Sequence, residues 1–473
     1  MAWIRPLPAA LLIALVLAPV CAVGLPLTEA VRRRDARAVR ALIASRVDLN
    51  AAEADGATAL HWAVHLDDPA IVEQLLAAGA RPDPANDLGI TPLSLACTNG
   101  SADMVTRLLA AGANPNRPVA VPPLLTCARS GNVRAVSALL AARADVNARE
   151  RSRSQTALMW AVSRNHAPVT QLLITRGADI HARSAVRRLL VNRANPNDVY
   201  TAVVGEVSVG GSTPLHVAAR QGSVESAHLL LDAGAAVDDL APDGTSALVL
   251  AAHSDEAAMA TLLLERGANP NIVSAGYTAL HAAVLRGNLG LVRTLLAKGA
   301  SVNSRVRHGT TTTRGTRDYY LPETLAGATP FWLAARFLEV PIMRELLAAG
   351  ADPALGLPDG TTPLMAAAGA PAQQRLFDRR ERVTLLREPD EPLAVDAVLV
   401  ALAAGGRVEA ANQAGDTALH AAAAQNYPAV VDLLVSKGAR PDAGNAKGQT
   451  PLDVATGDEA RSALRGRGAG PQR

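Results

Sequence analysis

A short phrase recurs along this chain and limits its fold more than any other feature. Its full form runs from a glycine through Thr, then Pro or Ala, to Leu and often His, and looser copies begin at Pro122, Thr156, Ser246 and Thr329. The full copies lie at residues 56–61, 89–93, 211–216, 276–281, 360–364, 415–420 and 448–452. Their base period is about 33 residues, with three longer steps that must hold insertions. A period in this range indicates stacked structural units rather than one compact core.

A second phrase, Leu-Leu followed by Gly-Ala, comes after each copy of the first, as in residues 75–80, 108–113, 263–268 and 295–300. The threonine of the first phrase is a helix N-cap, and proline after it suits the first helical turn. The small alanines that follow suit a helix packed closely on its neighbours, whereas the Leu-Leu pair anchors a second, antiparallel helix. Glycine then accepts the left-handed conformation that ends this helix. Neither helix can bury its apolar stripe alone, so the pairs are expected to stack.

With these residues the array resembles the ankyrin repeat family over nearly all of the chain after residue 24. The resemblance implies an all-α solenoid of stacked antiparallel helix pairs with hairpin-like fingers between them. We expect about 11–12 units, including degenerate caps at residues 27–50 and from Thr450 onward. An aromatic content of only 3% agrees with an α-rich chain.

The first 24 residues have the pattern of a secretory signal. One positive charge, Arg5, precedes an apolar run from Leu11 to Val20, and small residues follow from Cys21 to Gly24. We predict cleavage after Ala22 or Gly24; a lipoprotein signal at Cys21 and an uncleaved anchor are the alternatives. The apolar run is short for a bilayer span. The expected localisation is therefore periplasmic or secreted, as in the exported bacterial ankyrin repeat proteins that the chain resembles.

The repeat array is expected to occupy residues 25–464, followed by a flexible tail at 465–473, with insertions near 183–210, 303–327 and 369–394. The first insertion has two interpretations: a long finger, or a truncated repeat, because Leu189–Asn197 matches the spacing of a second helix. The second carries an Arg/Tyr cluster that is either an interaction site or a solvated loop. The third is nearly neutral and suggests an exposed helix or a mobile loop.

No motif for catalysis or cofactor binding is present: we find no H-E-x-x-H, G-x-S-x-G, Walker or Rossmann pattern. Of the ten histidines, His61, His216, His281 and His420 occupy one slot of the repeated phrase. The family resemblance implies that this slot is structural and bridges neighbouring loops. We therefore predict a non-enzyme with no catalytic, cofactor-binding or metal-binding residues.

The cysteines give no C-x-x-C pair. Cys97 and Cys127 fall in adjacent repeats, where helix spacing favours two buried thiols, although a disulfide is the alternative in an oxidising compartment.

The resemblance implies a concave binding surface formed by the first helices and the fingers. Tryptophan and arginine, which are enriched at interface centres, fall on it. The predicted contact residues are Trp62, His65, Trp160, Arg164, Arg220, Arg286, Arg336, Arg317, Tyr319 and Tyr320. For the tryptophans, packing against neighbouring fingers is the alternative.

The predicted function is a non-catalytic scaffold that mediates protein–protein interaction in the periplasm or outside the cell. The alternatives are a secreted host-directed effector and, less favoured, an enzyme that uses the insertions. The partner is expected to be an unidentified protein or peptide. Nucleic acid is not expected, because the net charge is only +3 and the basic residues look scattered. The array is expected to be monomeric and to lack a stable membrane span after signal removal.

Overall fold

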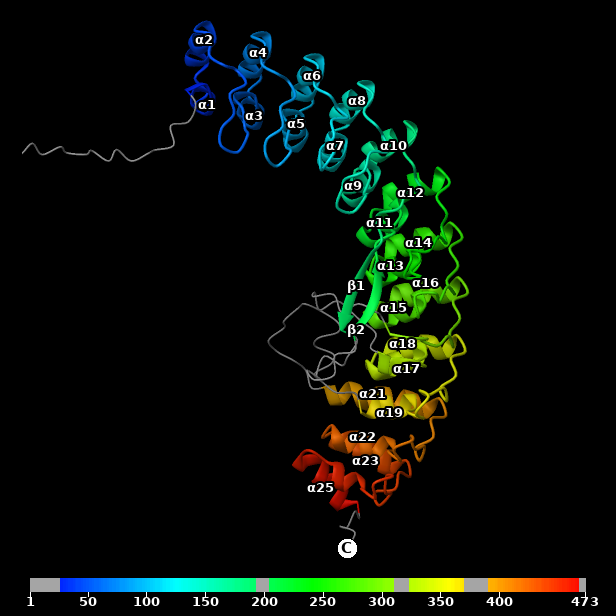
Figure 1. Ribbon diagram of the computed structural model, residues 1–473. Helices are drawn as coiled ribbons and strands as arrows, with labels where there is room; N and C mark the ends of the chain where they lie inside the picture. The colour runs from blue at the N-terminus through cyan, green and yellow to red at the C-terminus, as the bar shows by residue number, and fades with distance from the viewer. Residues whose placement is uncertain (1–25, 193–203, 310–322, 370–389, 468–473) are drawn as a thin grey trace, which may run out of the picture.

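The computed structural model describes residues 26–192, 204–309, 323–369 and 390–467. Over these residues the chain forms a curved stack of helix pairs that runs from one terminus to the other (Figure 1). From α1 to α16 the first helices lie on the inner side of the arc and the second helices on the outer side. The all-α repeat solenoid predicted from the sequence is confirmed, with one small two-stranded sheet added.

Twelve helix pairs make up the described part of the stack, within the predicted range. The first helices are short and are α1 (Pro26–Arg32), α3 (Ala59–His65), α5 (Pro92–Asn99), α7 (Pro123–Ser130), α9 (Ala157–Ser163), α11 (Pro214–Gln221), α13 (Ala247–His253), α15 (Ala279–Arg286), α17 (Pro330–Arg336), α19 (Pro363–Ala368), α22 (Ala418–Ala424) and α24 (Pro451–Val454). The second helices are α2 (Ala36–Ala44), α4 (Pro69–Ala77), α6 (Ala102–Ala110), α8 (Val133–Ala141), α10 (Ala167–Thr175), α12 (Val224–Asp232), α14 (Ala257–Glu265), α16 (Leu289–Ala297), α18 (Val340–Ala348), α21 (Asp390–Ala403), α23 (Pro428–Ser436) and α25 (Asp458–Gly466).

One continuous apolar core joins all of these pairs, from Leu27 in α1 to Leu464 in α25. The first helices contribute alanines at their tightest contacts, such as Ala96 and Ala128, both fully buried. The second helices contribute the first leucine of each Leu-Leu pair, such as Leu263, also fully buried. Small residues inside and leucines behind them therefore build the stack as the repeated phrases predict.

Polar contacts set the distance between repeats at the turns after the second helices. An asparagine side chain in one turn accepts a hydrogen bond from a backbone N–H of the next turn. The pairs, with their Oδ1–N distances, are Asn116 with Asp145 (2.7 Å), Asn147 with Asp179 (2.8 Å) and Asn271 with Ser301 (2.7 Å). This ladder satisfies backbone groups that a turn would otherwise leave to water.

The first insertion forms a long β-hairpin finger. Strand β1 (Arg187–Asn192) pairs antiparallel with β2 (Val204–Val209), Arg187 opposite Val209 and Asn192 opposite Val204. Helix α9 still packs on α11 across the insertion, so the finger leaves the stack uninterrupted. The long-finger interpretation is confirmed, and the truncated-repeat interpretation is wrong because Leu189–Asn192 is strand rather than helix.

The other two insertions lie partly outside the described residues. Near the end of the second one, a short 3-10 helix (Glu323–Leu325) leads toward α17. The third separates the two helices of one repeat, and α21 begins at Asp390, four residues before the predicted end of that insertion. Helices α19 and α21 nevertheless pack together as one pair. The last helix, α25, continues to Gly466, two residues beyond the predicted end of the array.

Candidate functional site

The inner side of the arc is the surface that the first helices, the fingers and the β1–β2 hairpin share (Figure 1). Trp62 and Trp160 occupy equivalent positions in α3 and α9, and both are half-buried. His65, Arg220, Arg286 and Arg336 lie in the last turns of their first helices, and Arg164 caps α9. Arg317, Tyr319 and Tyr320 lie outside the described residues.

Trp62 is held between its own finger and the preceding repeat. Its indole Nε1 donates to Glu53 Oε2 at 2.9 Å, and the Arg32 guanidinium lies 4.1 Å from the ring centroid. Glu53 also binds Arg32 in an ion pair and accepts a hydrogen bond from the Thr28 hydroxyl at 2.9 Å. His65 meets the same indole ring edge-on, with ring centroids 5.8 Å apart. The tryptophan is therefore fixed by a carboxylate and a cation, while part of it stays exposed.

Trp160 has a similar arrangement, without the carboxylate and the histidine. Its Nε1 donates to the Gln155 side-chain oxygen at 3.0 Å, and the Arg129 guanidinium from the preceding repeat lies 5.0 Å from its ring centroid. The finger acceptor is thus a neutral amide instead of a carboxylate. Both tryptophans contact a finger and remain half-exposed, so packing and partner contact are compatible roles for them.

The arginine and acceptor partners of the tryptophans were not singled out from the sequence. Arg32 and Arg129 sit in the last turns of α1 and α7, one repeat before the indole that each covers. A signal did exist, because a basic residue recurs in the last turn of the first helices. Which indole ring such a residue covers depends on how neighbouring repeats are aligned, and the sequence of one repeat does not give that alignment.

The histidines of the repeated phrase connect each N-cap to the next finger. In His61 the ring Nδ1 accepts from the Thr58 backbone N–H at 3.1 Å, and Nε2 lies 3.0 Å from the Ile90 carbonyl oxygen. His216, His281 and His420 make the equivalent contacts. The accepting Nδ1 places the proton on Nε2, which donates to the carbonyl, so the neutral ring satisfies both groups. The predicted structural role of this slot is confirmed.

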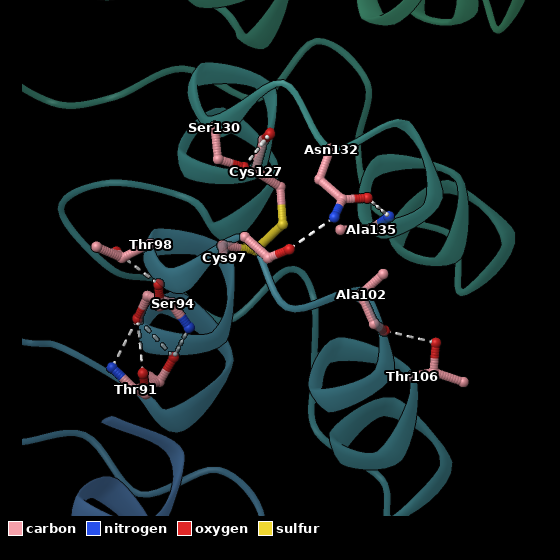
Figure 2. Close-up of a disulfide and its surroundings, with 11 residues drawn as sticks. Thr91, Ser94, Cys97, Thr98, Ala102, Thr106, Cys127, Ser130, Asn132 and Ala135 are labelled. Carbon is pink, nitrogen blue, oxygen red and sulfur yellow. Dashed lines mark hydrogen bonds between the residues drawn. A yellow bond between two sulfur atoms is a disulfide. The ribbon is translucent and has the colours of Figure 1, made fainter. Parts of the chain in front are cut away.

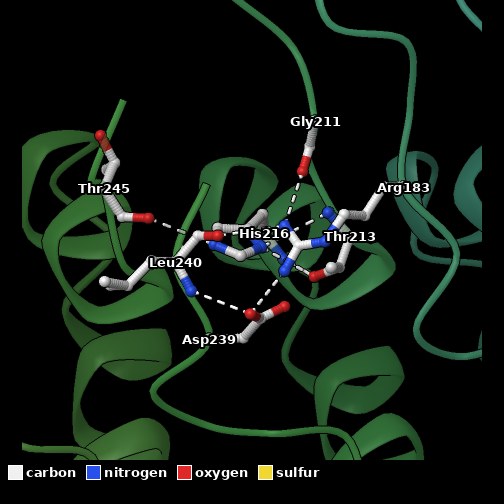
Figure 3. A network of polar contacts seen from close by, with 7 residues as sticks. All are labelled: Arg183, Gly211, Thr213, His216, Asp239, Leu240 and Thr245. Atoms are coloured by element: carbon white, nitrogen blue, oxygen red, sulfur yellow. Dashed lines mark hydrogen bonds and ion pairs between the residues drawn. The ribbon is translucent and has the colours of Figure 1, made fainter. Parts of the chain in front are cut away.

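Figure 3 shows this contact beside the base of the β-hairpin finger. Arg183 Nη1 donates to the carbonyl oxygens of Gly211 and Leu240, each at 3.0 Å, and Nη2 forms an ion pair with Asp239 at 2.6 Å. Arg183 and Gly211 flank the hairpin, and Leu240 belongs to the next finger. One side chain therefore closes the base of the hairpin and fastens it to its neighbour.

The same closure recurs at the second insertion. Arg305 Nη1 donates to the carbonyl oxygens of Gly327 and Gly356, each at 2.9 Å. His281 Nε2 lies 3.1 Å from the Ser304 carbonyl oxygen and 3.3 Å from that of Ala328, one on each side of the insertion. Arg183 and Arg305 thus fix where the inserted segments leave and rejoin the stack.

Burial lowers the pKa of the His281 imidazole to about 4, and the hydrogen bonds to Ala328 and Ser304 raise it by less. Burial also lowers the pKa values of His61 and His216. An unfolded histidine binds a proton near its ordinary pKa of 6.5, whereas the folded His281 does not until about pH 4. The stability that the neutral ring contributes is therefore complete above pH 6.5 and is lost as the pH falls toward 4.

We expect the free energy of unfolding to fall between pH 7 and pH 4, by on the order of 3 kcal/mol for His281 alone. Urea unfolding followed by circular dichroism at a series of pH values measures this. His281→Gln keeps a polar side chain but cannot titrate, so its stability should be lower at pH 7 and should vary less between pH 7 and pH 5. If the free energy of unfolding changed equally with pH in the two proteins, the His281 imidazole would be ruled out as the source of the pH dependence.

Comparison with known proteins identifies the repeats. The family model for ankyrin repeats in sets of three copies matches residues 27–119, 120–184, 182–274, 215–306 and 394–466, which together cover most of the chain. The chain belongs to the ankyrin repeat family.

Among curated relatives, this ankyrin array is 30% identical over 276 residues to the transient receptor potential cation channel subfamily A member 1 of Drosophila melanogaster. That match covers 52% of this chain but only 23% of the channel. Among solved structures, the human ASB11 ankyrin repeat domain is 28% identical, with a TM-score of 0.43, over 52% of this chain and 99% of that domain.

A disulfide joins two first helices of the ankyrin array, Cys97 in α5 and Cys127 in α7 (Figure 2). The two Cα atoms are 4.4 Å apart and both side chains are fully buried. The expectation of two free thiols is wrong. It relied on the usual spacing between helix axes, but alanines on the facing surfaces let these two backbones approach within disulfide range.

Sites of other kinds were also sought in the ankyrin array. The described residues hold no group of three or more His, Cys, Asp or Glu side chains arranged to bind a metal ion. Across the same residues, no helix combines the length and apolar character that a bilayer crossing requires. An open hollow of about 620 Å³ between α23 and α25 is lined by Asp432, Asp458 and Glu459. Arg467, Arg461 and Asn426 respectively engage these carboxylates.

Proposed function

We propose that this ankyrin array is a non-catalytic scaffold that binds a protein or peptide on its inner face, as a monomer in the periplasm or outside the cell. Ankyrin repeats are an interaction fold, which supports the general role. The observation that carries the specific proposal is the pair of half-exposed tryptophans, Trp62 and Trp160, each combined with an arginine on that face. Tryptophan and arginine are the residues that most often dominate binding energy at interface centres.

The fingers supply the rest of the proposed surface. The β1–β2 hairpin lies on the same inner side of the arc as the first helices (Figure 1). Its base is fixed by Arg183, so its position relative to α11 and α13 is set before any partner binds. A preorganised surface loses less conformational entropy on binding. Tyr319, Tyr320 and Arg317 would add contacts from the second insertion.

Export of the chain is the second part of the proposal. Residues 1–24 have the composition of a secretory signal, and a buried disulfide persists in oxidising compartments but is rare in reducing ones. The test is the oxidation state of Cys97 and Cys127 in cells that produce the chain with or without residues 1–24. Oxidised cysteines only in the longer form, recovered outside the cytoplasm, would support export. Cytoplasmic recovery of both forms would count against it.

Partner capture tests the proposed surface. Immobilised array should recover a partner from periplasmic extract, and Trp160→Ala or Tyr320→Ala should weaken that capture about tenfold or more. Melting temperatures identify variants that lost binding only because they lost structure. Arg134→Ala on the outer helix α8, where Arg134 pairs with Asp103 at the surface, is the matched control and should capture normally. Capture by the Trp160 and Tyr320 variants at the level of the unmodified array would show that the partner binds elsewhere.

A further inference from the structure

Positive charge is concentrated in one part of the array. Residues 143–193 contain ten arginines and only three acidic residues, although the whole chain carries a net charge of only +3. This stretch includes the finger before α9, the helices α9 and α10, and the base of the β-hairpin finger. The basic residues are therefore less scattered than their distribution over the whole chain suggests.

The finger before α9 is built around a buried carboxylate. Glu150 is 4% exposed and accepts hydrogen bonds from the backbone N–H groups of Ser152, Arg153 and Gln155, and from the Ser152 hydroxyl. Because its oxygens are used inside the finger, Glu150 forms no ion pair with the neighbouring Arg151. Arg151 and Arg153 are exposed at the finger tip.

Neighbouring fingers are joined to this one through the backbone. The Arg151 N–H donates to the Ala120 carbonyl at 3.1 Å, and the Ala185 N–H donates to the Arg153 carbonyl at 2.6 Å. Arg187, two residues after Ala185, begins strand β1 and is also exposed. Arg151, Arg153 and Arg187 thus belong to two fingers held side by side. Within the described residues, none of these three guanidinium groups has a carboxylate partner, whereas Arg117 on the preceding finger and Arg183 at the base of the hairpin do.

The two tryptophans of the inner face each have an arginine guanidinium over the indole ring, but only one of these guanidinium groups is bound by a carboxylate. At Trp62 the Glu53 carboxylate binds both the indole N–H and the Arg32 guanidinium that covers the ring. At Trp160 the equivalent indole contact is to the neutral Gln155, and Arg129 has no carboxylate partner among the described residues. By its backbone bond, Glu150 in this finger matches Glu53, but the Glu150 carboxylate is bound inside its own finger. Among the described residues, the Trp160 indole N–H and the Arg129 guanidinium are therefore left without the carboxylate that joins their counterparts.

We propose that Arg129 and Trp160, together with Arg151, Arg153 and Arg187, bind a carboxylate-rich peptide segment of the partner. This inference rests on the proposed function and specifies the chemistry of its ligand. One acidic side chain takes beside Arg129 the position that Glu53 takes beside Arg32, and others reach the arginines of the fingers. Guanidinium and carboxylate groups form charge-assisted, often bidentate hydrogen bonds, which suits arginine to this ligand.

The spacing of the repeats suggests the pattern of acidic residues. Neighbouring layers of helices pack about 8–10 Å apart, and an extended peptide advances about 3.3 Å per residue. Acidic residues at every third position of an extended segment would therefore match successive fingers. Nucleic acid fits less well, because single strands bind through rows of aromatic side chains. Residues 149–156 and 183–187 contain no aromatic residue.

The test uses a fluorescein-labelled dodecapeptide with Glu at every third position and Gly or Ser between, and a matched peptide with Gln in place of Glu. Fluorescence anisotropy at low salt should show binding of the Glu peptide and at least tenfold weaker binding of the Gln peptide. Gln155→Glu would supply the missing carboxylate within the chain, so it should weaken binding of the Glu peptide about tenfold. Arg129→Gln should do the same.

The control for charge is Gln171→Glu on the outer helix α10, which makes the same chemical change at an exposed position and should leave binding within about twofold. Equal binding of the two peptides, or equal weakening by Gln155→Glu and Gln171→Glu, would overturn the proposal. So would tighter binding of a dodecamer of deoxythymidine than of the Glu peptide. If the peptide proposal fails while Trp160→Ala still abolishes partner capture, the scaffold function stands with a different ligand chemistry. If Trp160→Ala also leaves partner capture unchanged, the proposed function fails as well.

Discussion

Replacing Leu263 by alanine should lower the free energy of unfolding by about 2–5 kcal/mol. Leu263 is fully buried in α14, the second helix of a central repeat. Helix α14 packs against α13 of its own repeat and against α12 and α16 of the two neighbouring ones, so truncation opens a cavity where three repeats meet. Urea denaturation followed by far-ultraviolet circular dichroism measures the loss.

A matched leucine on the surface separates cavity formation from a general effect of the substitution. Leu399 in α21 is 42% exposed, so Leu399→Ala should change the free energy of unfolding by less than about 0.5 kcal/mol. Because each repeat contacts only its neighbours, the Leu263→Ala array should also lose part of its helical signal at lower urea concentration than the rest. Unchanged stability of this variant would contradict the alignment of α14 with its neighbours.

Loss of the disulfide should have an effect of similar size. The bond closes a loop between residues 30 apart in sequence, and the chain-entropy model gives about 3–4 kcal/mol for a loop of that length. The double variant Cys97→Ala, Cys127→Ala should therefore melt well below the oxidised array. Differential scanning calorimetry with and without a strong reductant gives the comparison.

The double variant is also the control for the reductant, because it has no disulfide left to reduce. Reductant should lower the melting temperature of the unmodified array and leave that of the variant unchanged. Equal melting temperatures of the unmodified array under both conditions would mean that the Cys97–Cys127 bond does not stabilise the fold.

The repeat architecture could be predicted because each repeated residue acts locally. Thr91 caps α5 through a contact three residues away, and Leu93 and Ala96 of that helix are fully buried in the core. The histidine slot was found from the repeated phrase and its structural role was implied by the family resemblance; its contact is also local, since His61 meets Thr58 within one helical turn. For these features the sequence pattern and the structural contact cover the same few residues.

Contacts between repeats were harder to predict because they depend on alignment and on local packing distance. Arg129 meets Trp160 across 31 residues of sequence, and nothing within either repeat indicates that pairing. Cys97 and Cys127 were correctly placed in adjacent repeats. The prediction of free thiols assumed the usual distance between helix axes, whereas the two alanine-lined helices approach closely enough for a disulfide. The segment Leu189–Asn197 matched a second helix in spacing, yet its partner strand, rich in valine, draws Leu189–Asn192 into a hairpin.

Arg183 and Arg305 each close an inserted segment at the point where it leaves the stack. The first helices on either side of each inserted segment pack directly on each other, α9 on α11 and α15 on α17. Evolution, or an engineer, can therefore exchange a finger for one of another length or composition without repacking the solenoid, provided that the arginine and the two carbonyls it holds are kept.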